Sequence, residues 1–122
     1  MIRSAFLVML TTACSLPLVA HAQVNPFRSS RVGSGLSQQD LRELGDAGRR
    51  LYTQDNVANG ASDTWSNSQS GNSGTVTVVD SFQRQGNACR KLRYDIRLKV
   101  RSGVRTYTLN WCRQPDGSWK IV

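Results

Sequence analysis

Apolar and charged side chains alternate strictly over residues 92–101, and this alternation constrains the fold more than any other feature of the sequence. A period of two places the apolar side chains on one face of a β-strand and the charged ones on the other. One face of that strand must therefore be covered by another element, while the opposite face meets solvent. Segments with the same period flank it, separated by turn sequences rich in glycine, asparagine and serine. We therefore expect an antiparallel sheet with strands at 64–67, 75–82, 90–101, 104–113 and 118–122.

A helix is predicted ahead of the sheet. Ser37 has the hydroxyl of an N-cap residue, and Asp40 would lie in the first turn, where the helix dipole favours negative charge. Apolar and small residues then recur at helical spacing: Leu41, Leu44, Gly48, Leu51 and Tyr52. Gly45 and Gly48 weaken a helix, so their presence indicates that its backbone closely approaches a flat surface. The predicted fold class is therefore α+β, with one amphipathic helix packed on a four- to five-stranded antiparallel sheet.

The first 22 residues have the features of a signal peptide. A basic start at Arg3 precedes an apolar stretch, and the small residues Ala20 and Ala22 predict cleavage before Gln23. Threonine, serine and proline interrupt the apolar stretch, which argues against a membrane-spanning helix. The predicted organisation is a signal peptide at 1–22, a flexible polar leader at 23–36 and one small domain at 37–122.

Cys14 offers an alternative to cleavage after Ala22. The segment from Leu10 to Cys14 is similar to a lipoprotein box, in which the cysteine is acylated and becomes the new amino terminus. Such boxes have a large apolar residue three places before the cysteine, and here Thr11 occupies that position. The apolar stretch also continues beyond Cys14. Export without lipidation is therefore the main prediction, and lipidation of Cys14 is the alternative.

The alternation also predicts a register for the third and fourth strands. If residues 102–103 form a two-residue turn, Tyr94 lies opposite Trp111 and apolar side chains face one another along the hairpin. The polar side chains of both strands then share the other face.

Cys89 and Cys112 are the two cysteines that remain after signal cleavage. An even pair in a small exported domain is normally bridged, so we expect a Cys89–Cys112 disulfide. The register above places Cys112 opposite Arg93, an offset of about 13 Å from Cys89, which is farther than a disulfide reaches. The disulfide therefore predicts that the strand bends before Lys91.

Three blocks of sequence are similar to a known family: residues 65–76 (WSNSQSGNSGTV), 86–90 (GNACR) and 111–122 (WCRQPDGSWKIV). In order and spacing they resemble the carboxy-terminal domain of the bacterial surface antigen family related to the 17 kDa rickettsial antigen. The resemblance implies a location in a Gram-negative envelope, often at the outer membrane, and no established enzymatic activity. Many relatives carry a lipidated cysteine and a glycine-rich central segment, whereas here the lipoprotein box is imperfect and the glycines are scattered through turns.

Residues that commonly perform catalysis are scarce in the expected mature chain. The single histidine, His21, lies in the predicted signal peptide, and Glu43 is the only glutamate. The aspartates are scattered without a pairing pattern, so the sequence indicates neither acid–base catalysis nor a metal site. We expect a non-enzymatic cell-envelope protein of surface antigen type, with a structural or interaction role, an envelope protein as partner, and no cofactor or metal.

Basic side chains line the polar face of the third predicted strand: Arg93, Arg97, Lys99 and Arg101. Because the chain has a formal net charge of +8, the alternative hypothesis is an anion-binding module for lipopolysaccharide or acidic phospholipid at the outer membrane. A solvated face that keeps the domain soluble is the competing interpretation. Nucleic acid is not expected as a partner, because the chain is exported and no aromatic side chains interleave with the basic ones. The sequence leaves membrane association, oligomeric state and the choice between periplasm and outer membrane open.

Overall fold

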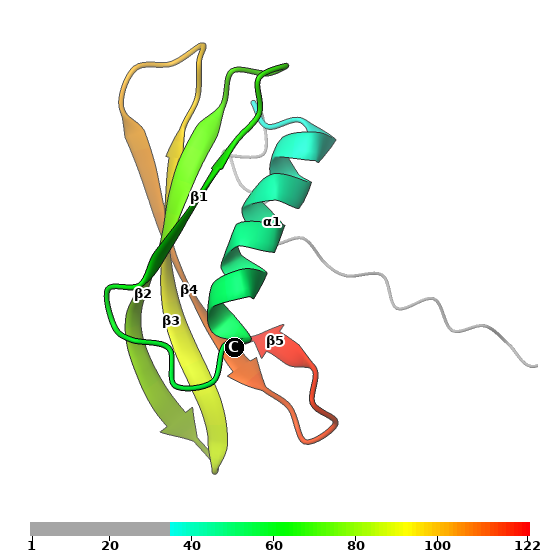
Figure 1. The fold of residues 1–122 in the computed structure, drawn as a ribbon, viewed down its shortest axis with the longest axis vertical. Helices are drawn as coiled ribbons and strands as arrows, with labels where there is room; N and C mark the ends of the chain where they lie inside the picture. Colours follow the sequence, from blue (N-terminus) through cyan, green and yellow to red (C-terminus); the bar gives the residue numbers. More distant parts are fainter. Residues whose placement is uncertain (1–34) are drawn as a thin grey trace, which may run out of the picture.

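The computed structural model describes residues 35–122, which form one helix followed by five strands. The helix is α1 (Gln38–Tyr52), and the strands are β1 (Ser62–Ser66), β2 (Ser73–Arg84), β3 (Asn87–Arg97), β4 (Val104–Arg113) and β5 (Trp119–Ile121). Each strand pairs antiparallel with the next, in the spatial order β1-β2-β3-β4-β5. Helix α1 lies against one face of this sheet, mainly over β1 and β2 (Figure 1). The predicted α+β class, one helix on an antiparallel sheet, is confirmed.

The predicted signal peptide at 1–22, Cys14 and most of the predicted leader lie outside the described residues. Leu36, the last residue of the predicted leader, is buried and packs with the core of the domain. Across residues 35–122, no helix has the length and hydropathy needed to cross a bilayer.

Helix α1 begins with the N-cap that the sequence predicts. Ser37 Oγ accepts a hydrogen bond from the Asp40 amide at 3.1 Å, and the Asp40 carboxylate accepts one from the Ser37 amide at 2.8 Å. This capping box satisfies two backbone donors that the first turn would otherwise leave unpaired.

The core lies between α1 and the apolar face of the sheet, and Gly48 sets how closely the two approach. A Cβ added to Gly48 would come within 2.6 Å of the Tyr94 hydroxyl oxygen, which accepts a hydrogen bond from Trp111 Nε1 at 3.0 Å. The predicted close approach of the helix backbone is therefore confirmed at Gly48. It is wrong at Gly45, which is exposed and would have no neighbouring atom within 4 Å of an added Cβ.

The β3–β4 hairpin has a different register from the predicted one. Strand β3 ends at Arg97, and a loop of six residues, 98–103, leads to β4. Tyr94 consequently pairs with Tyr107, four residues away from the predicted partner Trp111. Because an even shift preserves the side-chain alternation, each residue within β3 and β4 keeps its predicted face.

Two contacts outside the hairpin explain why β3 ends early. The Leu98 side chain turns into the core, where it is 4% exposed. The Lys99 amide donates a hydrogen bond to Asn72 Oδ1 at 2.9 Å, so it is satisfied by the β1–β2 loop instead of by β4. A two-residue turn at 102–103 is therefore not formed.

Cys89 and Cys112 lie directly opposite each other on β3 and β4 and form a disulfide with a Cα–Cα distance of 4.1 Å. The predicted bridge is confirmed. The predicted bend before Lys91 is wrong, because the observed register already brings the two cysteines together. The irregularity lies instead on β2, whose register shifts between Val78 and Asp80.

Candidate functional site

The face of the sheet that points away from α1 carries no other element from residues 35–122, and we call it the open face. Its centre consists of three rows of side chains that cross β1, β2, β3 and β4 in register. The rows are Ser66, Ser73, Arg97 and Val104; Thr64, Thr75, Asp95 and Thr106; and Ser62, Thr77, Arg93 and Thr108. Eight of these twelve residues carry a hydroxyl, so the open face is dominated by groups that both donate and accept hydrogen bonds.

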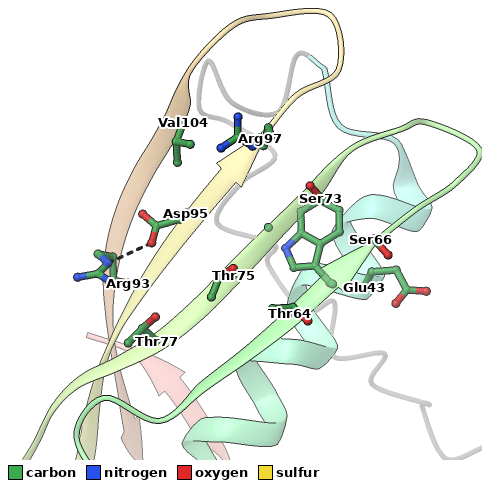
Figure 2. Close-up of a pocket in the computed structure, with 12 residues that line it drawn as sticks. Glu43, Thr64, Ser66, Ser73, Thr75, Thr77, Arg93, Asp95, Arg97 and Val104 are labelled. Carbon is green, nitrogen blue, oxygen red and sulfur yellow. Dashed lines mark hydrogen bonds and ion pairs between the residues drawn. The ribbon is translucent and has the colours of Figure 1, made fainter.

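The alternation of threonine and valine in β2 produces this division of faces. Val76 and Val78 are fully buried on the side of α1, while Thr75 and Thr77 lie on the open face (Figure 2). Both residue types are β-branched and suit a strand. Their order therefore decides which side of the sheet is apolar and which meets solvent.

Charge on the open face is concentrated on β3. Arg93 Nε lies 3.2 Å from Asp95 Oδ2 (Figure 2), and Thr106 Oγ1 donates to Asp95 Oδ1 at 2.7 Å. Asp95 offsets the charge of Arg93, although an ion pair this exposed contributes at most about 1 kcal/mol. Arg97 is exposed and forms no ion pair with any residue between 35 and 122. Arg97 is therefore a cation of the open face that is available to a partner.

A shallow hollow crosses the open face and reaches the edge of the sheet at β1 (Figure 2). Glu43 of α1 and Trp65 of β1 line it together with residues of the open face. Trp65 Nε1 is buried without a hydrogen-bond partner in the described part of the chain. The hollow is wide and lined by hydroxyl and charged groups, which suits contact with an extended polar surface.

The four basic residues predicted to form one stripe are divided between two places. Arg93 and Arg97 lie on the open face as predicted, but β3 ends at Arg97. The prediction that Lys99 and Arg101 lie on the same strand is therefore wrong. Both belong to the 98–103 loop, where the Lys99 side chain packs over Gly71.

A second polar constellation lies at the start of α1, and we call it the Asp40 cluster: Asp40, Asn67, Ser70 and Asn72. The Asp40 carboxylate is fully buried and accepts hydrogen bonds from Asn67 Nδ2 (2.9 Å), Ser70 Oγ (2.6 Å) and Asn72 Nδ2 (2.8 Å). Burial alone raises the pKa of Asp40, but the hydrogen bonds from Ser70, Asn72, Ser37 and Asn67 outweigh it and hold the pKa below its ordinary value.

The Asp40 cluster joins three parts of the chain. Asn72 also donates to the carbonyl oxygen of Gly35 at 3.0 Å and accepts from the Lys99 amide, so it links the helix start to the β3–β4 loop. The carboxylate is occupied by these donors, which assigns the cluster a structural role. Within residues 35–122 no group of three or more metal-ligating side chains is placed to hold an ion. Sequence analysis missed the cluster, although Asn67, Ser70 and Asn72 all lie in the first block that carried the family resemblance.

Arg90 links the other end of α1 to the sheet. Its guanidinium is buried, donates to the carbonyl oxygens of Cys89 (3.1 Å) and Gln54 (3.4 Å), and lies 5.9 Å from the centre of the Trp119 ring. A cation near a helix carboxy terminus is stabilised by the helix dipole, and the indole adds a cation–π contact. Arg90 therefore fastens the end of α1 to the sheet beside the disulfide.

These features define a class of small two-layer α+β domain, with a disulfide-linked antiparallel sheet, one covering helix and one open polar face. The chain belongs to the family described as 17 kDa outer membrane surface antigen, whose model matches residues 53–120. The matched residues include β1 to β4, the first two residues of β5 and the β1–β2 loop, while α1 and Asp40 precede them. Membership groups the chain with exported, cell-surface proteins.

Two curated relatives, both named 17 kDa surface antigen and both from Rickettsia bellii, one of them from strain RML369-C, are 30% identical to the chain over 94 residues. The alignment covers 76% of this chain and 57% of each relative, so the chain spans little more than half of their length. No solved structure matches the chain.

Proposed function

We propose that this domain is a non-catalytic interaction module of the bacterial cell envelope, and that the open face is its contact surface. The observation that carries the proposal is the set of three hydroxyl-rich rows on a sheet face that α1 leaves uncovered. Such a face suits a polar partner, either an envelope protein or an envelope polymer, because hydroxyls can donate and accept without a fixed charge. The predicted signal at 1–22 would deliver the domain to the periplasm or to the outer membrane.

The carboxylates that lie near other polar groups support a contact role over a catalytic one. Asp40 is buried and saturated by hydrogen bonds, and Asp95 is bonded on both of its oxygens. Asp40 is closed off from any substrate, and Asp95 lines the hollow with both of its oxygens already engaged by Arg93 and Thr106. We therefore assign them to folding and to the charge pattern of the open face.

The test is site-specific photo-crosslinking in intact cells. A photoreactive residue at Thr75 or Thr106, both on the open face, should yield discrete adducts with an envelope component. The same residue at Gln39 or Arg42, both exposed on α1, is the matched control and should yield none. Adducts that form equally from both surfaces, or only from α1, would contradict the proposal.

A second candidate function is binding of anionic lipid, either lipopolysaccharide or acidic phospholipid. It is favoured by the gathering of Arg97, Lys99 and Arg101 at one end of the sheet, where none of them forms an ion pair within the described residues. This candidate uses the end of the sheet and leaves the middle of the open face free. The two functions are therefore compatible in one molecule.

A further inference from the structure

We propose that the tip of the β3–β4 hairpin docks on the surface of an anionic phospholipid bilayer, with the Val100 side chain in the headgroup region and the surrounding cations on lipid phosphates. We define the tip by six residues: Arg97, Lys99, Val100, Arg101, Val104 and Arg105. The inference rests on the anion-binding candidate above and specifies the residues, the lipid and the geometry.

The first observation is the charge of the tip. Four of its six residues are cations, and none of them forms an ion pair with another residue in 35–122. The sequence contains no acidic residue between Asp95 and Asp116, so no carboxylate within the hairpin end offsets this charge. Asp95 itself is engaged by Arg93. A cluster of this kind is attracted to anionic headgroups over a distance of about one Debye length.

The second observation is the exposure of two valines among these cations. Val100 is 81% exposed and stands between Lys99 and Arg101, and Val104 is 48% exposed at the start of β4. Val100 is the most exposed of the large apolar side chains in residues 35–122. An apolar side chain flanked by cations matches the bilayer interface, where apolar groups enter the acyl boundary and the long basic side chains extend toward phosphates.

The third observation is the way the tip is held. Leu98 is buried in the core, the Lys99 amide is bonded to Asn72, and the Arg101 amide donates to the Leu98 carbonyl oxygen at 3.3 Å. The base of the loop is therefore fixed while its end projects from the sheet, at the end where α1 begins (Figure 1). Arg97 and Val104 face each other across the base (Figure 2). A loop ordered before binding loses little conformational freedom when it docks.

The surface beside the tip is also compatible with contact to a flat bilayer. The β1–β2 loop, 67–72, lies at the same end of the molecule and contains only uncharged residues. It contributes neither repulsion from lipid phosphates nor an aromatic group on which a nucleobase could stack. The tip itself has no aromatic residue either, and cations around an exposed valine are better matched by a bilayer than by a protein pocket.

The experiment measures where the protein meets vesicles. Val100→Trp places a reporter at the tip, and Val79→Trp places one at another exposed valine, 42% exposed, on β2. With vesicles of phosphatidylcholine and phosphatidylglycerol, the emission of Val100→Trp should shift to the blue, relative to wild type, and become protected from an aqueous quencher. Val79→Trp should show neither effect, and vesicles of phosphatidylcholine alone should produce neither.

A charge series separates docking at the tip from general attraction by net charge. Lys99→Gln with Arg101→Gln should lower the partition coefficient for the anionic vesicles about 30-fold. The matched pair Arg42→Gln with Arg49→Gln removes the same charge from the exposed face of α1 and should lower it much less. Equal losses in the two pairs would overturn the proposal.

Three further results would also overturn the proposal. One is vesicle binding that leaves the Val100→Trp emission unchanged, because the contact surface would then lie elsewhere. Another is binding to lipopolysaccharide micelles but not to phospholipid vesicles, which would keep the anion-binding candidate and exclude the bilayer. The third is a failure of every vesicle to bind. Open-face crosslinking does not depend on these results, so the two proposals can fail separately.

Discussion

Replacing Asp40 with alanine should destabilise the domain more than any exposed substitution. The change removes the acceptor of four donors: the Ser37 amide and the side chains of Asn67, Ser70 and Asn72. At about 1 kcal/mol for each donor left unpaired, the free energy of unfolding should fall by about 4 kcal/mol. A domain of this size is expected to have about 4–13 kcal/mol in total, so the loss is a large fraction.

Urea unfolding followed by circular dichroism measures this loss. With a slope of about 1–1.5 kcal/mol per molar, the midpoint should fall by about 3–4 M at unchanged slope. Asp46→Ala, at an exposed site on the same helix, is the control and should change the free energy by less than about 0.5 kcal/mol. If the free energy of unfolding of Asp40→Ala were within about 1 kcal/mol of that of Asp46→Ala, the Asp40 cluster would not be the link between helix and hairpin.

The same carboxylate predicts a pH dependence. Because the pKa of Asp40 is lowered in the folded state, its stabilisation is fully present above the unfolded-state pKa of about 3.9 and is lost as the pH falls through the folded-state pKa. The difference in stability between wild type and Asp40→Asn should therefore be constant near neutral pH and shrink in acid. The pKa values of Asp63 and Asp116 are also lowered, by hydrogen bonds from Arg50 and Ser118, but both residues are present in the two proteins and cancel. A difference that stayed constant down to strong acid would contradict the assignment.

Two further predictions concern packing and the disulfide. Gly48→Ala should destabilise the domain by about 1–3 kcal/mol, because the new methyl group would displace the Tyr94 hydroxyl. Gly45→Ala, where an added Cβ meets no neighbour, should instead stabilise the domain by up to about 1 kcal/mol. Thermal unfolding of the two variants measures both effects. Cys89→Ser with Cys112→Ser should lower the free energy of unfolding by about 3 kcal/mol, measured by urea unfolding, and a loss below about 1 kcal/mol would mean that the closed loop contributes little to stability.

Local patterns were sufficient to predict the elements and the faces of the sheet. The helix start at Ser37, the strand alternation and the division between Val76 and Thr75 all depend on neighbouring residues, and the structure contains each of them. An error in register did not disturb this division, because a shift of four residues moves no side chain to the other face.

Contacts between distant residues account for what could not be predicted. Asp40 bonds to residues 27 to 32 positions later, and Asn72 captures the Lys99 amide 27 positions along the chain. No local sequence pattern predicts these long-range hydrogen bonds. The serine and glycine at 102–103 have the composition of a tight turn, and the Asn72 contact overrides that preference.

The disulfide also sets how the domain would respond to a pull along its chain. It joins β3 to β4 across 23 positions, so the β3–β4 hairpin, including the projecting tip, would stay closed under force until the bond is reduced. A pull between residue 122 and the part of the chain before Cys89 would extend the segments on both sides of the closed loop, including about 35 Å of chain after Cys112. The residues between the two cysteines would not be extended. In a reducing solution the same pull would release roughly 80 Å more, so force spectroscopy with and without a reductant would report the bridge as a change in contour length.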